Sequence, residues 1–359
     1  MLYGYITSIK CLDTGDGISK RQPRSRRTTN GAGSRSVGPS WTQLEAQKQL
    51  LLARSLAPNS LNTYRTGINQ YLRFCGSFGI RPLPLSENVL ENFCVSLCHR
   101  ISHKSIKVYL CGVQYLSKIN GFRSLIEHML RLDYVIKAIR RFQGNKFNRP
   151  ARPPVTWQML CDICAFLAGT EQPFNRDMLI SAVLLAFFGL LRVSEYTTPS
   201  ASFFDEDTHL SPADVTFNWK RRVALIRIKK SKTDPFRQGV TIRVGILDHY
   251  LCPVHALLRY LVRRGPAPGP LFIFQDGTFL TRAKVLNVLT SSLPHVPHVN
   301  THSFRRGGAS ALADANTPSH VIQIMGRWKS NAYMEYILLT DEFLISAQLS
   351  MSHEVSKHK

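Results

Sequence analysis

Acidic residues are scarce in this chain of 359 residues. Asp and Glu together number 23 against 46 Lys and Arg, which leaves a formal charge of +23 and a pI near 10.0. A compact protein with this imbalance repels itself unless a polyanion binds to it. Nucleic acid is the commonest dense lattice of negative charge, so the composition predicts a nucleic-acid partner. An anionic membrane surface is the competing partner, but the sequence shows neither a clear basic amphipathic helix nor a lipidation motif.

Membrane-length apolar runs and a secretory signal are also missing. The apolar run MLISAVLLAFFGLL (Met178–Leu191) is too short to span a bilayer and is followed directly by Arg192. It predicts a helix that is buried on all sides in the middle of a domain. The N-terminal region lacks an apolar segment before a small-residue cleavage site. We therefore expect an intracellular protein whose eight cysteines are reduced.

The cysteines do not form a zinc-binding pattern. Cys161 and Cys164 read C-x-x-C, and Cys94 and Cys98 precede His103, but neither group has a second half at zinc-like spacing. We therefore predict no metal site and expect these cysteines to pack as small apolar residues on helices.

Shifts in composition divide the chain into four parts. Residues 1–42 are basic, rich in Ser and Gly and poor in large apolar groups, which predicts a disordered arm. This arm is either a nuclear-import or DNA-contacting segment or a solvated linker. The segment GNKFNRPARPPVTW is typical of an extended linker. We place a helical domain at 43–148, a mixed domain at 149–345 and a flexible tail at 346–359.

The first domain has the periodicity of short amphipathic helices. Apolar residues recur every three or four positions, with Gly121 suited to end one helix. The outer face of its last helix carries Lys137, Arg140 and Arg141, which we predict to contact DNA phosphates. The sequence thus predicts a compact all-helical module with a basic outer surface.

The second domain mixes helices with a small β-sheet. The pattern predicts helices at 157–167, 177–191, 253–262, 282–293, 302–315 and 318–325. Two strands are predicted at 223–229 and 240–244, joined by a polar turn region. The expected fold class is therefore mainly α with a small β-sheet, as an all-helical domain followed by an α+β domain.

Four short motifs of the second domain carry groups suited to phosphate chemistry. GLLRVSE places Arg192 at the end of the buried helix, and a charged group there is costly unless it faces a partner. KKSKTD places Lys232 in the turn between the two strands. HSFRRGG supplies His302 and Arg305, which share one helix face. The last motif is MGRWKSNAYMEYI, and its candidate residues are Arg327, Trp328, Tyr333 and Tyr336.

In this order the motifs resemble the tyrosine recombinases, also called the phage integrase family. That family has Arg, Lys, His-x-x-Arg, His or Trp, and then the nucleophilic Tyr. The resemblance covers about residues 45–345, and it implies a SAM-like core-binding domain followed by a recombinase catalytic domain. The segments HSFRRGGA and GRWKS are similar to the corresponding segments in the recombinases of DIRS-type and Ngaro-type retrotransposons and Cryptons.

The resemblance implies a role for each candidate residue. Arg192 and Arg305 would each donate two hydrogen bonds to the scissile phosphate, and Tyr336 would attack it to form a 3′-phosphotyrosyl bond. Lys232 would protonate the leaving oxygen. The assisting residues are His302 and Trp328 at the phosphate or the tyrosine, Glu195 orienting Arg192, and Arg306, Arg327 and Lys230 as DNA contacts. Such chemistry implies no metal, ATP or other cofactor.

Three assignments keep an alternative. Tyr336 lies nine positions after Arg327, which matches the family spacing, and Tyr333 is the alternative nucleophile. Arg327 stands where many relatives have histidine, so we assign that role to Trp328 and keep Arg327 as the alternative. Lys230 could replace Lys232 as the general acid, because the strand register is not determined by the sequence to one residue.

The expected function is site-specific recombination of double-stranded DNA. A nuclear homotetramer assembled on DNA would integrate or excise a mobile element through a covalent intermediate. One alternative is a domesticated DNA-binding protein without activity, and another is a type IB topoisomerase, which shares the Arg, Lys and Tyr chemistry. The helical first domain and the short C-terminus favour the recombinase. The target site and the direction of the reaction do not follow from the sequence.

Overall fold

The chain divides into two compact units, Met1–Arg149 and Pro150–Lys359. The computed structural model describes residues 38–53, 55–123, 126–148, 150, 152–232, 234, 238–337 and 345. Most of the basic arm predicted at 1–42, and the tail predicted at 346–359, lie outside these residues. The last two positions of the predicted arm are helical, because α2 begins at Trp41.

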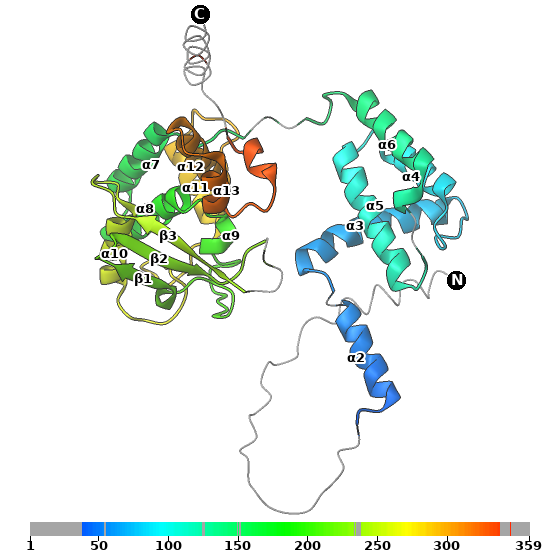
Figure 1. Ribbon diagram of the computed structural model, residues 1–359, viewed down its shortest axis with the longest axis horizontal. Helices are drawn as coiled ribbons and strands as arrows, with labels where there is room; N and C mark the ends of the chain where they lie inside the picture. The colour runs from blue at the N-terminus through cyan, green and yellow to red at the C-terminus, as the bar shows by residue number, and fades with distance from the viewer. Residues whose placement is uncertain are drawn as a thin grey trace, which may run out of the picture. The chain divides into compact units, whose positions relative to one another are not determined.

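The first unit is entirely helical where it is described (Figure 1). Two glycines allow α3 and α5 to touch through their backbones, because a Cβ at Gly67 would lie 2.6 Å from Tyr109 Cα and one at Gly112 would lie 2.7 Å from Tyr64 O. Buried aromatic and aliphatic side chains form the core. The elements are α2 (Trp41–Ala53), α3 (Pro58–Ser77), α4 (Glu87–Leu97), α5 (His103–Ile119), η1 (Ile126–His128) and α6 (Leu130–Gln143).

A buried glutamine joins the end of α6 to the turn between α4 and α5. The Gln143 amide nitrogen donates to the carbonyls of Cys98 at 2.7 Å and Ile101 at 2.8 Å, and its oxygen accepts from the His103 N–H at 2.8 Å. Because a buried amide is costly unless it is hydrogen-bonded, these bonds hold the last turn of α6 beside the first turn of α5.

The second unit combines helices with a three-stranded antiparallel sheet in the order β1-β2-β3. Its helices are α7 (Trp157–Thr170), α8 (Pro173–Phe188), α9 (Val193–Tyr196), α10 (Pro253–Arg264), α11 (Arg282–Ser292), α12 (Ser303–Asp314) and α13 (Ser319–Gly326). The remaining elements are β1 (Val215–Asn218), β2 (Val223–Ile228), β3 (Val240–Gly245), η2 (Pro212–Asp214) and η3 (Asn331–Glu335). The predicted fold class, mainly helical with a small sheet, is confirmed.

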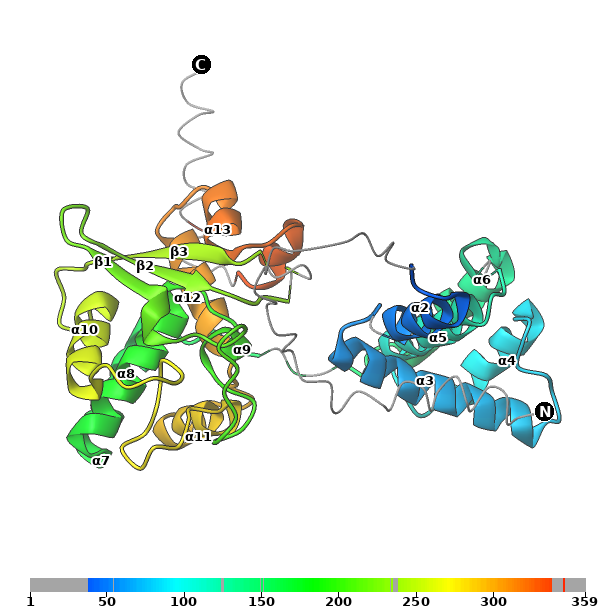
Figure 2. The same ribbon diagram turned by 90° about the horizontal axis from the view of Figure 1, so that it is seen from below.

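Helix α8 forms the centre of the second unit. Every residue from Asp177 to Phe187 is buried, as the apolar run predicts. Helix α10 lies along α8 (Figure 2). None of the helices in the described part of the chain is both long enough and apolar enough to cross a membrane.

Two features of the second unit differ from the prediction. Helix α8 ends at Phe188 instead of Leu191, because the backbone turns at Gly189 and Leu190, and Leu190 has a φ of 47°. The sequence pattern predicted β2 and β3 but not β1, because the four residues of β1 include only two large apolar side chains. Arg192 therefore precedes the short helix α9 and does not end the buried helix.

Candidate active site

Helix α12 packs closely against the core of the second unit. A Cβ at Gly307 would collide with the carbonyl of Val155, and one at Gly308 would collide with that of Phe187. The small residues of the HSFRRGGAS segment therefore let the helix backbone approach its neighbours. This contact places His302 and Arg305, at the start of α12, beside the turn that follows α8.

Arg192 lies at the N-cap of α9 and binds two elements. Its Nη1 lies 2.9 Å from Glu195 Oε1 and 3.3 Å from the hydroxyl of Ser231. Its backbone N–H donates to Glu195 Oε2 at 3.0 Å. Because Ser231 directly precedes Lys232, this contact brings the turn after β2 to the arginine. Ser231 lies in the KKSKTD motif but was not among the predicted site residues.

Glu195 binds a second arginine from the other end of the unit. Its side chain is fully buried, and Nη2 of Arg327 lies 2.7 Å from its Oε2. Arg327 also donates to the carbonyls of Gly189 at 3.2 Å and Leu190 at 3.1 Å. Burial lowers the pKa of the Arg327 guanidinium, Glu195 opposes the shift, and Arg192 adds to it. Predicted as a DNA contact, Arg327 instead directs its terminal nitrogens to protein groups here.

Arg305 is fully buried at the centre of the cluster. Its terminal nitrogens donate to the carbonyls of Leu190 and Gly326. The Trp328 ring lies over its guanidinium, with 4.2 Å between the ring centroid and Cζ. Burial, together with Arg192 and Arg327, lowers the pKa of Arg305 to about 9, so the cation still predominates at neutral pH.

The two candidate tyrosines differ in their environment. Tyr336 is half-buried, and its ring lies 5.2 Å from Trp328 and 5.8 Å from Arg305 Cζ. Tyr333 is 4% exposed and packs in a small apolar cluster with Ala309. Burial suits a packing tyrosine, whereas a nucleophile has to reach its substrate. The geometry therefore favours Tyr336 over Tyr333.

His302 lies at the N-cap of α12, half-buried among cations. Burial lowers its pKa from the ordinary value of 6.5, and four arginines lower it further. A neutral imidazole at pH 7 is able to accept a proton. The four arginines are Arg152, Arg282, Arg305 and Arg192. Arg152 and Arg282 lie in none of the four sequence motifs.

The remaining predicted residues of this unit lie at its surface. Lys230 and Lys232 are exposed in the turn after β2. Lys229, which directly follows β2, pairs with Asp214 at 2.7 Å. Arg306 donates to the carbonyl of Glu335 at 2.8 Å, which ties α12 to the segment before Tyr336.

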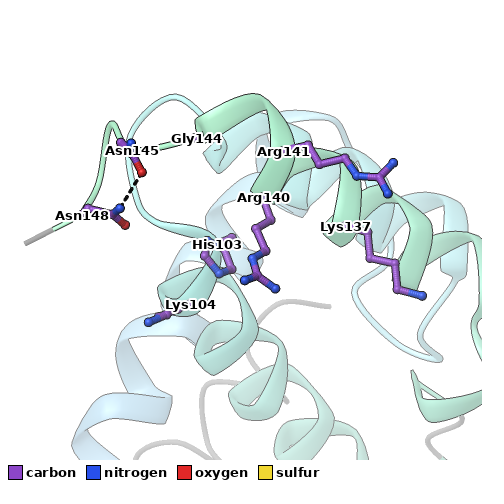
Figure 3. A pocket seen from close by; sticks show the side chains of 8 residues that line it. All are labelled: His103, Lys104, Lys137, Arg140, Arg141, Gly144, Asn145 and Asn148. Atoms are coloured by element: carbon purple, nitrogen blue, oxygen red, sulfur yellow. Dashed lines mark hydrogen bonds between the residues drawn. The ribbon is translucent and has the colours of Figure 1, made fainter. Parts of the chain in front are cut away.

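The predicted DNA contacts of the first unit line a basic hollow of about 510 Å³ (Figure 3). Lys137, Arg140 and Arg141 reach it from α6, and His103 and Lys104 from the first turn of α5. Lys137 also pairs with Asp133 at 2.7 Å. Desolvation, followed by Arg140, lowers the pKa of His103. The hollow thus gathers cationic side chains from α5 and α6 at one place on the first unit.

The cysteines of the C-x-x-C pair and of α4 do not gather with other ligand residues. Within the described residues, no three His, Cys, Asp or Glu side chains come close enough together to hold a metal ion. Burial raises the pKa of Cys94 and of Cys164 to about 12, as for inert thiols in apolar surroundings.

The chain is similar in sequence and in fold to known recombinases. No family model matches the sequence. The chain is 26% identical over 325 residues to tyrosine recombinase XerD of Mycobacterium leprae, covering 84% of this chain and 94% of that protein.

Solved structures share the fold across both units. The Tn1549 transposon integrase in complex with transposon right end DNA has a TM-score of 0.55 at 14% identity, covering 86% of this chain and 97% of that chain. The XerH site-specific recombinase bound to palindromic difH substrate has a TM-score of 0.56 at 17% identity, covering 86% and 84%. A lambda integrase dimer bound to a core site has a TM-score of 0.52 at 13% identity, covering 82% and 93%. Together with the sequence match, these structures support the tyrosine recombinase family.

Proposed function

We propose that the chain is a tyrosine recombinase that cleaves and rejoins double-stranded DNA through a 3′-phosphotyrosyl intermediate. The observation that carries the proposal is the gathering of one ordered set of side chains from distant parts of the sequence. Arg305 contacts Trp328 and lies near Tyr336, Arg192 reaches the Lys232 turn through Ser231, and His302 begins the helix that carries Arg305.

The chemistry of phosphoryl transfer matches this set. The reaction depends mainly on positioning and on neutralising the phosphate charge, which two arginines provide. The Tyr336 hydroxyl forms a bond to phosphorus as the bond to the 5′ oxygen breaks, and Lys232 gives that oxygen a proton. His302 takes the tyrosine proton or binds the phosphate. Because the phosphotyrosyl bond is itself an ester, the reverse attack rejoins the strand without ATP or a metal.

DNA binding has to rearrange part of the cluster. Arg305 is fully buried, with both terminal nitrogens on carbonyl groups and Trp328 above the guanidinium. A phosphate therefore reaches Arg305 only if the groups around its guanidinium shift. Gly326 permits the present arrangement, because a Cβ there would overlap the Trp328 ring.

The biological role and the assembly are inferred from the residues of the motifs and from fold analogy. We propose integration or excision of a mobile element, in a homotetramer assembled on DNA in the nucleus. The fold match to a transposon integrase supports the mobile-element role at the level of analogy.

A second candidate is a DNA-binding protein of the same fold that has lost turnover. The burial of Arg305 and the inward position of Arg327 favour this candidate, because neither guanidinium is presented to a ligand. A covalent adduct with DNA would exclude it.

Covalent trapping tests the proposal. The purified full-length protein is incubated with nicked duplexes of random central sequence, denatured in SDS, and the protein-linked DNA is sequenced. We expect an adduct in the wild type and in Tyr333→Phe, and none in Tyr336→Phe. Loss only in Tyr333→Phe would move the nucleophile to Tyr333. Salt-sensitive DNA binding without any adduct would favour the inactive DNA-binding protein.

A further inference from the structure

Three arginines converge on one buried carboxylate near the N-terminal end of α8. Asp177 is 2% exposed, and Nε of Arg263 lies 2.5 Å from its Oδ2. Nε of Arg176 and Nε of Arg259 each lie 3.4 Å from its Oδ1. Arg259 and Arg263 come from α10, which lies along α8 (Figure 2). The cluster therefore joins the two helices at one place.

The charges of this cluster do not balance. One carboxylate faces three guanidinium groups, and in the part of the chain that the structure describes no second carboxylate pairs with any of the three. Arg263 at 2.5 Å is by itself enough to neutralise Asp177. The side chains of Arg176, Arg259 and Arg263 are 32%, 50% and 45% exposed, so the surplus positive charge lies at the surface. An anion bound there would relieve the repulsion between them.

The way the arginines bind Asp177 leaves their best donors available. Each of the three contacts the carboxylate through Nε, and an arginine has four further N–H donors on its two terminal nitrogens. Those terminal groups form the paired hydrogen bonds by which arginine binds phosphate oxygens. The contact between Asp177 and each Nε restricts the orientation of the guanidinium before an anion binds. Less conformational entropy is then lost on binding.

We propose that Arg176, Arg259 and Arg263 form a phosphate-binding site for the backbone of a second nucleic-acid duplex. The chain carries a formal charge of +23, which favours a polyanion over an isolated anion. Asp177 and Phe188 are separated by eleven residues of α8, or about 16 Å at the helical rise, and Arg192 follows beyond Phe188. The phosphate held here is therefore not the one held by Arg192 and Arg305.

A bridging assay tests this site in the full-length protein. The protein is loaded on a bead-bound duplex, washed, and offered a labelled second duplex. The variant R176Q/R259Q keeps the close Arg263–Asp177 pair, and K220Q/R221Q removes two charges from the exposed turn between β1 and β2 as a matched control. We expect R176Q/R259Q to capture roughly ten-fold less of the second duplex, consistent with the loss of charge-assisted contacts. Binding of the first duplex, and capture by the control, should stay unchanged.

A further variant separates binding through paired hydrogen bonds from attraction by net charge alone. R176K/R259K keeps the charge but not the paired donors, so we expect its capture to fall between the wild type and R176Q/R259Q. Equal capture by the wild type and R176Q/R259Q, or an equal loss in K220Q/R221Q, would overturn the proposal. If R176Q/R259Q unfolds at lower urea than the wild type, R259Q alone gives the comparison. Tyr336→Phe should still bridge two duplexes, so failure of the catalytic proposal is detected separately.

Discussion

Glu195 binds two arginines that lie far apart in the sequence. Its fully buried carboxylate contacts Arg192 at 2.9 Å and Arg327 at 2.7 Å. A buried charge is tolerated only where partners compensate it, so each arginine depends on the other to keep Glu195 in place. Arg327 thereby acts as a positioning residue for Arg192.

Removing Arg327 should destabilise the protein and disorder Arg192. We expect R327M to lower the free energy of unfolding by about 3 kcal/mol, because it leaves the buried Glu195 with one arginine partner and removes the donor to the Gly189 carbonyl. Urea unfolding measures this change, and the yield of covalent adduct should fall with it. R222M is the control, since Arg222 pairs with the exposed Asp248 and its loss should change little. Equal effects of the two variants would contradict the assignment.

His302 should make the protein less stable in acid. Its pKa in the folded protein is below 6.5, so the unfolded chain binds a proton at a pH where the folded protein does not. The free energy of unfolding therefore falls as the pH decreases from about 7 through 6.5, and it levels off below the folded pKa. H302Q should lose this part of the pH dependence, which urea unfolding between neutral pH and pH 5 detects. Parallel curves for wild type and variant would refute the expectation.

The close contact between α12 and the end of α8 positions Arg305 in the site. Gly307 and Gly308 let the helix backbone touch the carbonyls of Val155 and Phe187, and Arg305 projects from the same turn toward Leu190. A helix held at this distance has no room for a Cβ on that face. The packing of one element therefore determines the position of the guanidinium.

A methyl group on this face should cost stability. We expect G308A to lower the free energy of unfolding by about 1–3 kcal/mol, because the new Cβ would collide with the Phe187 carbonyl and push α12 outward. The matched control is G169A in α7, where nothing lies within 4 Å of the new Cβ, and it should gain up to about 1 kcal/mol from helix propensity. Urea unfolding of both variants distinguishes these outcomes, and a stable G308A would disprove the close-packing argument.

The molecule as a whole presents cations on both of its units. The hollow of the first unit and the site of the second unit each gather arginine or lysine, as expected for a protein that neutralises many phosphates. The affinity for DNA should therefore fall steeply with salt. Assembly into a tetramer would require the segment after Tyr336 to contact a neighbouring subunit. Residues 338–344 and 346–359 of this segment lie outside the described residues.

Truncation tests the assembly of the whole molecule. A chain that ends at Thr340 should bind DNA as the wild type does but fail in strand exchange, because the apolar segment LLTDEFLISAQL is expected to dock on a neighbouring subunit. DNA binding is measured by anisotropy, and strand exchange on sites obtained from the trapping experiment. Recombination at the wild-type rate by the truncated protein would rule out this role.

Some features of this protein follow from its sequence alone. These features are local, so one sequence is enough to predict them. They are the charge composition, the buried helix before Arg192, the order of the motifs and the small residues of α12. The prediction of a mainly helical fold with a small sheet was confirmed for this reason. The short strand β1 was not found, because four residues carry too little periodicity to distinguish them from a loop.

The tertiary structure decided which groups the charged side chains face. Glu195 and Arg327 are 132 positions apart, and no local pattern indicates that they meet. The burial of Arg305 under Trp328, the turn at Leu190 that moves Arg192 to α9, and the convergence of three arginines on Asp177 likewise depend on packing between distant elements. A sequence specifies which ionisable groups are present, but their partners depend on distances in space, because electrostatic and hydrogen-bond energies vary with separation and burial.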